Sequence, residues 1–141
     1  MKLVPDLIHD QRISTVTPKN TVREAARVMT EHDIGAILVV ENAKLAGIFS
    51  ERDLLKRVVG RDLDPDAVLV SDVMTKNPDT LPPEADIRQA MRLMVEHGYR
   101  HIPVVDGQRI VGMMSVRDIY TNMVKSIQSG VSALARDLLQ G

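Results

Sequence analysis

The chain repeats itself, and this repetition constrains its fold more than any other feature of its 141 residues. When the sequence is shifted by 65 positions, residues 15–53 align with residues 80–118 without a gap. Fifteen of the 39 aligned positions are identical, where chance would give about two or three. Residues 4–8 also resemble residues 70–74, with a slip of one position. The chain is therefore a duplicated unit of about 60 residues.

Each unit predicts the same order of elements. Thr21 with Glu24, and Asp86 with Gln89, form capping-box patterns that open an amphipathic helix in each unit. A short β-branched run, a turn and a returning strand follow each helix. We expect a mixed α/β (α+β) fold, with strand–helix–strand–strand–helix in each unit. The two units should pack with pseudo-two-fold symmetry, because a single unit cannot cover its own apolar sheet face.

We expect the first repeat to span residues 1–66 and the second to span residues 67–125, with a polar loop before the boundary. Residues 126–141 have no counterpart in the first repeat and predict a C-terminal helical tail. One apolar stripe along it consists of Val131, Leu134, Ala135 and Leu138. Such a stripe packs against the chain's own core or a dimer partner; the alternative is a docking surface for another protein.

Composition excludes several classes of protein. The absence of cysteine excludes a disulfide scaffold, thiolate zinc sites and a cysteine nucleophile. A net charge of −1 and three aromatic residues argue against a nucleic-acid partner. The longest apolar stretch, residues 35–40, is far too short for a membrane helix, and the first residues lack a signal-peptide core. We therefore expect a cytoplasmic protein. We also expect no metal site.

One chemical motif occurs in both units. Residues 47–53 and 112–118 share the pattern Gly, two apolar residues, Ser, any residue, Arg, Asp. A serine followed three residues later by an acid caps a helix, and capping alone would explain both motifs. The alternative is a nucleoside-phosphate site. A helix N-terminus and an arginine suit a phosphate, and an aspartate suits the two hydroxyls of a ribose.

These motifs resemble the signature of cystathionine-β-synthase (CBS) domains. The run at residues 99–106 and the lead-in at residues 70–75 resemble that family as well. Two such domains in tandem form a Bateman module, and the resemblance covers about residues 4–125. It implies a β-α-β-β-α unit, two clefts between the paired domains, adenosine ligands and dimerisation of modules into a disc. The implied ligands are AMP, ADP, ATP or NAD(H), with S-adenosylmethionine ranked behind them.

The resemblance also implies roles for individual residues. Asp118 and Asp53 would hold ribose hydroxyls, and Ser115 and Ser50 the phosphate or ribose. The arginines of the motif and the pair before the second strand would bind phosphate, and two apolar residues would line the adenine pocket. These further candidates are Arg117, Arg52, Arg100, His101, Met113 and Ile48. The adenine would also contact the segments leading into the other repeat, around residues 11–13 and 76–78.

The two repeats differ at one of these positions. Gly35 and Ala36 stand in the first repeat where the second has Arg100 and His101. We therefore expect unequal clefts. The Asp118 cleft should prefer a nucleotide with phosphate, while the Asp53 cleft, which lacks both side chains, should bind weakly, bind a nucleoside or stay empty. Arg100 reaching across the pseudo-two-fold axis would remove this difference.

Three functions follow from these observations. The first is a regulatory module that binds an adenosine nucleotide and acts in trans on an unknown partner, as an energy or redox sensor and as a homodimer. The second, an enzyme, lacks a nucleophile–base pair, a metal cluster and a Walker-type loop, so we expect neither catalytic residues nor a catalytic cofactor. The third is a ligand-independent dimerisation scaffold in which the Ser and Asp residues are only caps.

Overall fold

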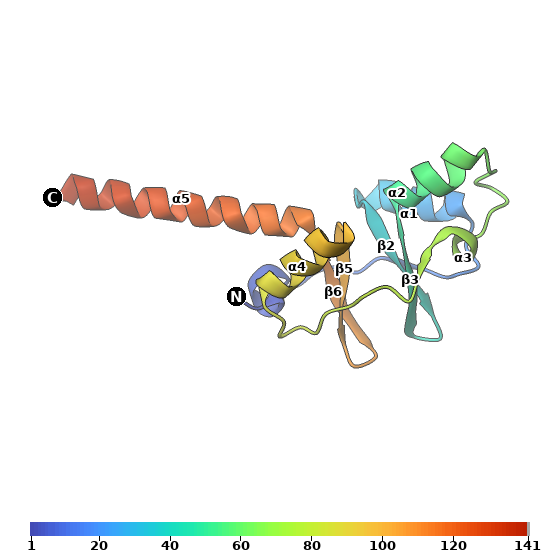
Figure 1. The fold of residues 1–141 in the computed structure, drawn as a ribbon, viewed down its shortest axis with the longest axis horizontal. Helices are drawn as coiled ribbons and strands as arrows, with labels where there is room; N and C mark the ends of the chain where they lie inside the picture. The colour runs from blue at the N-terminus through green and yellow to red at the C-terminus, as the bar shows by residue number, and fades with distance from the viewer. Residues whose placement is uncertain (141) are drawn as a thin grey trace.

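A computed structural model describes residues 1–140 and confirms the mixed α/β fold with a C-terminal helix (Figure 1). The first repeat contains β1 (Thr15–Val16), α1 (Val22–His32), β2 (Ala36–Glu41), β3 (Lys44–Ser50), α2 (Glu51–Asp53), η2 (Leu54–Val58) and η3 (Val59–Arg61). The second contains α4 (Ile87–His97), β5 (His101–Asp106), β6 (Arg109–Ser115) and α5 (Val116–Gln140). The lead-in segments contain η1 (Leu3–Leu7) before the first repeat, and α3 (Val70–Val73) and β4 (Thr75–Lys76) before the second.

Each repeat is built on an antiparallel hairpin. In the first, β2 pairs with β3 and the sheet order is β1-β2-β3-β4; in the second, β5 pairs with β6. Both hairpins shift register at the same place, after Val39 in one and after Val104 in the other. Because these residues occupy equivalent positions, the duplication preserves even the irregularity of the strand pairing.

The second repeat lacks its expected first strand. The counterpart of β1 is a single parallel bridge between Leu81 and Val104. Leu81 donates its amide to the Pro103 carbonyl at 3.1 Å, and its carbonyl accepts the Val105 amide at 3.0 Å. The first repeat also pairs Thr15 with Leu38, but Pro103 stands at the position of Leu38 and has no amide hydrogen to donate, so the ladder does not extend to Thr80.

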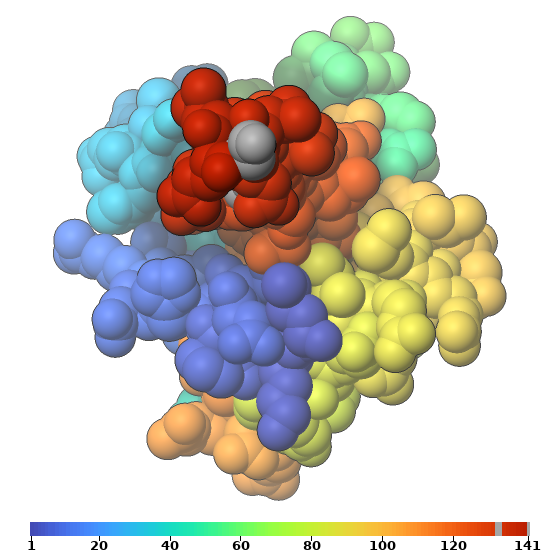
Figure 2. All heavy atoms as spheres, turned by 90° about the vertical axis from the view of Figure 1, so that its left-hand side faces the viewer, coloured from blue at the N-terminus to red at the C-terminus, as the bar shows by residue number. Residues whose placement is uncertain are grey.

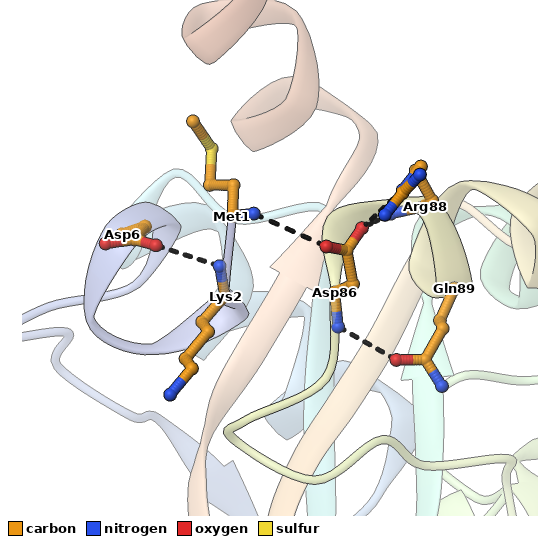
Figure 3. A network of polar contacts seen from close by, with 6 residues as sticks. All are labelled: Met1, Lys2, Asp6, Asp86, Arg88 and Gln89. Atoms are coloured by element: carbon orange, nitrogen blue, oxygen red, sulfur yellow. Dashed lines mark hydrogen bonds and ion pairs between the residues drawn. The ribbon is translucent and has the colours of Figure 1, made fainter.

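Each helix between strands begins as predicted. The Thr21 side chain accepts the Glu24 amide and starts α1, and the Asp86 side chain accepts the Arg88 amide and starts α4. The same Asp86 lies 3.3 Å from the amino group of Met1, which fixes the first residues beside α4 (Figure 3). The hydrogen bonds from Arg88, first its amide and then its side chain, lower the pKa of Asp86 to about 2.

The lead-in segments cross over between the repeats. Leu3 and Ile8 are buried in the core of the second repeat, and Val70 and Val73 are buried in the core of the first. Each lead-in therefore ends beside the hairpin of the other repeat, which brings backbone from both halves to the space between them. Within residues 1–140, no helix combines the length and hydropathy needed to span a membrane.

Candidate functional site

Two clefts lie between the repeats, and each combines three segments. The Asp118 cleft has a volume of about 840 Å³ and lies between the β6–α5 junction, residues 33–36 and the lead-in residues 11–14. The Asp53 cleft has a volume of about 1070 Å³ and lies between the β3–α2 junction, residues 97–101 and the lead-in residues 75–79. Both are large enough for a small-molecule ligand.

The structure brings all ten candidate residues to these clefts. The Asp118 cleft is lined by Met113, Ser115, Arg117, Asp118, Arg100 and His101. The Asp53 cleft is lined by Ile48, Ser50, Arg52, Asp53, Arg100 and His101. The lead-in residues 11–13 and 76–78 line the respective clefts as well.

Serine and aspartate form a capping box in each motif. The Ser115 hydroxyl donates to Asp118 Oδ2 at 2.9 Å, and the Asp118 amide donates back to Ser115 Oγ at 3.3 Å. The equivalent distances between Ser50 and Asp53 are 3.1 and 3.2 Å. Each carboxylate is thus held at a helix start that faces a cleft, while its second oxygen makes none of these capping contacts.

The helix starts offer fewer backbone donors than the sequence suggested. The Val116 amide donates to the Arg100 carbonyl at 3.0 Å, and the Glu51 amide donates to the Gly35 carbonyl at 2.9 Å. The amide of each aspartate is taken by its serine. Two of the first three amides in each helix are therefore occupied, and binding of an anion would depend more on side chains than on the helix end.

Each lead-in lies against a glycine of the opposite hairpin. Gly47 pairs with Lys76 in the β3–β4 ladder, and a Cβ on Gly47 would lie 2.7 Å from the Thr75 carbonyl oxygen. A Cβ on Gly112 would lie 2.5 Å from Gln11 Oε1. The motif glycines are thus required for close approach of the lead-ins, and the sequence motif alone did not reveal which segment approaches them.

Four residues belong to both clefts and form what we call the shared wall: Gly35, Glu51, Arg100 and His101. A Cβ on Gly35 would lie 3.1 Å from Glu51 Oε1 and 3.7 Å from His101 Cε1, so both side chains pack against this glycine. The expectation that the Asp53 cleft lacks Arg100 and His101 is therefore wrong. The chain crosses over between repeats, and residues 97–101 face the Asp53 motif.

The shared wall also sets the charge state of its histidine. Burial lowers the pKa of His101 below its usual value, and the positive charge of Arg100 lowers it further. The carboxylates of Glu51 and Asp118 act in the opposite direction. The net effect favours a neutral imidazole, which can accept or donate a hydrogen bond within either cleft.

Arg57 lies outside the motif but lines the Asp53 cleft and contacts both Asp53 and the lead-in. Its Nη1 donates to the carbonyls of Val73 and Met74 at 3.0 and 3.2 Å, and its Nε lies 3.7 Å from Asp53 Oδ1. The Asp53 side chain is only 13% exposed. The equivalent position in the second repeat is Asn122, so comparison of the repeats beyond the aligned block could have found this difference.

A second contact specific to this cleft involves Tyr99. Its hydroxyl donates to Asp79 Oδ2 at 2.6 Å, and its ring stacks on His97 with centroids 5.0 Å apart. The hydrogen bond to Asp79 raises the pKa of Tyr99. Both residues line the Asp53 cleft, so this bond connects its lead-in segment to residues 97–101 of the second repeat.

Both clefts have more cationic than anionic side chains in their linings. In the Asp53 cleft the cations are Arg52, Lys56, Arg57, Lys76 and Arg100, and the anions are Glu51, Asp53 and Asp79. In the Asp118 cleft the cations are Arg12, Arg100, Arg117 and Lys125, and the anions are Asp33, Glu51 and Asp118. An anionic ligand carrying hydroxyl groups fits both linings. Among the described residues, no cluster of three His, Asp or Glu side chains could hold a metal ion.

Comparison with known proteins gives a consistent result. The family model described as "CBS domain" matches residues 6–60 and 70–125. The CBS domain-containing protein YhcV of Bacillus subtilis is 33% identical over 92% of this chain and 91% of its own length. This chain spans about half the length of other curated relatives that it matches.

Solved structures are similar as well. A protein with CBS domains from Burkholderia ambifaria superposes with a TM-score of 0.82 at 33% identity, covering 86% of this chain and 93% of that protein. A CBS domain protein from Pyrobaculum aerophilum, solved in complex with AMP, gives a TM-score of 0.73 at 26% identity, covering 80% and 86%.

Proposed function

Because this chain belongs to the CBS-domain family, with both repeats matched, we propose that it is a regulatory module whose two clefts bind adenosine nucleotides. Proteins with a CBS pair are commonly regulatory nucleotide-binding modules rather than enzymes. The proposed ligand is AMP, ADP, ATP or NAD(H), with S-adenosylmethionine as a further candidate. The module acts in trans on a partner protein and, as a homodimer, reports energy or redox state.

One observation carries this proposal: the same Ser–x–Arg–Asp arrangement stands at a cleft in both repeats. Each aspartate is fixed by its serine, and the lining of each cleft contains at least one arginine. A carboxylate accepts the two hydroxyls of a ribose, and a neighbouring guanidinium binds phosphate. The AMP complex of the Pyrobaculum protein supports the choice of ligand class.

A second candidate function is a ligand-independent scaffold. The observation in its favour is that the capping boxes already use both serines and both aspartates. On this alternative, the motif is retained for helix starts alone, and nothing resembling adenosine binds.

The first experiment is to denature the purified protein and identify released small molecules by mass spectrometry. Titration calorimetry and thermal shifts with the candidate nucleotides follow, because a ligand at 100 times its Kd stabilises the native state by about 2.7 kcal/mol. Asp53→Ala and Asp118→Ala should each remove one binding event per chain. Glu24→Ala, which removes a capping-box acid outside both clefts, is the matched control.

The outcomes separate the two candidates. A released or stabilising nucleotide whose stoichiometry falls in both Asp variants supports the nucleotide-binding module. If no nucleotide is released and none shifts the melting temperature, the scaffold is the better description.

A further inference from the structure

The C-terminal half of α5 extends away from the rest of the chain. Figure 1 shows this helix projecting beyond both repeats, and Figure 2 shows its end standing in front of the body. With about 1.5 Å of rise per residue, its 25 residues form a rod. Of the two packings expected for the tail, the chain's own core is excluded, because Val131, Leu134 and Leu138 are 62%, 59% and 74% exposed; packing on a dimer partner remains.

The exposed apolar residues of α5 follow a regular spacing. Six of them, which we call the seam, are separated by alternating steps of four and three: Tyr120, Val124, Ile127, Val131, Leu134 and Leu138. Each is more than half exposed. Steps of four and three in alternation repeat every seven residues, which is the heptad pattern of a coiled-coil seam. The spacing therefore points to another helix as the occupant.

Residues beside the seam indicate what kind of helix fits. On one side lie Met123, Gly130 and Asp137, and on the other lie Thr121, Gln128 and Ala135. Only one of these six is charged, so two identical helices can lie side by side without like charges facing each other. These flanking positions also do not favour a partner recognised by complementary charge, because Asp137 is the only charged residue among the six.

The seam residues also favour a particular arrangement. In a heptad, Val124 and Val131 occupy the first core position, where β-branched residues favour two parallel strands. We propose that α5 forms a parallel, in-register, two-stranded coiled coil with α5 of a second copy of this chain. This proposal rests on the homodimer included in the proposed function and states which surface forms it.

The coiled coil begins at a cleft. Tyr120 and Val124 belong to the seam and also line the Asp118 cleft. A partner helix would therefore cover residues beside the mouth of that cleft, and dimerisation and ligand binding there would affect the same two side chains.

Sedimentation equilibrium tests the proposal with the full chain. The wild type should have twice the 15.7 kDa mass of one chain. Ile127→Glu should raise the dimer dissociation constant at least 100-fold, since two carboxylates would face each other in the seam. Ser129→Glu, on the opposite face of α5, is the matched control and should remain dimeric. Circular dichroism and a thermal melt establish that each variant is folded.

Cysteine cross-linking tests the orientation, because the native chain contains no cysteine. Under mild oxidation, Val131→Cys should form a covalent dimer readily, whereas Ser129→Cys should not. Equal cross-linking of the two variants, or loss of the dimer in Ile127→Glu without cross-linking at Val131→Cys, overturns the parallel arrangement.

The remaining outcomes separate this inference from the function on which it rests. A dimer that persists in Ile127→Glu overturns the seam and leaves the proposed homodimer standing. A monomeric wild type overturns both the seam and the homodimer. Nucleotide titration of the same samples tests the binding clefts separately.

Discussion

The side chain of Gln11 pairs with both backbone polar groups of Met113. Its Nε2 donates to the Met113 carbonyl at 3.0 Å, and its Oε1 accepts the Met113 amide at 2.7 Å. In the other half of the molecule, Lys76 makes the equivalent connection to β3 through its backbone. One lead-in is therefore attached by a side chain and the other by strand pairing.

This difference predicts that replacing Gln11 and Lys76 by alanine has unequal effects. Gln11→Ala should lower the free energy of unfolding by about 1–2 kcal/mol, because both hydrogen bonds are lost. It should also weaken nucleotide binding in the Asp118 cleft, since the lead-in forms one of its walls. Lys76→Ala, the control at the equivalent position, should keep its strand pairing. Chemical denaturation and calorimetry measure both effects, and equal losses in the two variants would contradict the explanation.

The two motif glycines should tolerate alanine to different degrees. A Cβ at Gly47 would meet the backbone oxygen of Thr75, whereas a Cβ at Gly112 would meet the end of the Gln11 side chain. Backbone can move less easily, so Gly47→Ala should cost about 1–3 kcal/mol of stability, with a smaller cost for Gly112→Ala. Urea denaturation of the two variants gives the comparison, and the reverse order would refute it.

Arg57 should matter for one cleft only. Arg57→Ala removes the ion pair with Asp53 and the hydrogen bonds to the lead-in carbonyls. We expect about tenfold weaker binding in the Asp53 cleft, corresponding to roughly 1.4 kcal/mol, and little change in the Asp118 cleft. Asn122→Ala is the matched control. Calorimetry in the Asp118→Ala background isolates the affected cleft, and unchanged affinity there would exclude this role for Arg57.

Arg100 should matter for both clefts. Its charge lines each of them, and a charge-assisted hydrogen bond contributes about 1.5–3 kcal/mol. Arg100→Ala should therefore weaken phosphate-bearing ligands roughly 10- to 100-fold in each cleft. Arg52→Ala should weaken only the Asp53 cleft, whose lining contains it. Titrations in single-cleft backgrounds test this, and an effect of Arg100→Ala confined to one cleft would be inconsistent with the shared wall.

The buried histidine predicts a dependence of stability on pH. The pKa of His101 is lower in the folded protein than its ordinary value, so the unfolded chain binds this proton more readily. The stability that the neutral imidazole contributes is present above about pH 6.5 and is lost as the pH falls through the lower, folded pKa. His101→Gln should therefore show a smaller decline in unfolding free energy between pH 7 and pH 5. His9→Gln controls for loss of an exposed histidine.

The repeat made most of the fold predictable. Local signals such as the capping boxes at Thr21 and Asp86 determine helix starts within a few residues, and the structure confirms both. The missing first strand of the second repeat has an equally local cause, since Pro103 stands where the first repeat has Leu38. Comparing proline positions between the repeats would have corrected that expectation.

What the sequence could not reveal depends on the crossing of the chain between repeats. The position of Arg100 in the sequence, directly before β5, predicts a role in one cleft, yet it lines both clefts. Glu51 was overlooked because it occupies the variable position of the motif, and its importance comes from packing against Gly35. Contacts between segments far apart in the chain carry no signature in the spacing of a single motif.

The shared wall couples the two clefts electrostatically through Arg100. A single guanidinium stands between two clefts, so a negatively charged group drawn to it from one side changes the electrostatic potential on the other. The two occupancies are then linked, and linkage of this kind is reciprocal. For the proposed nucleotide ligands, the affinity measured at one cleft therefore depends on whether the other cleft is occupied.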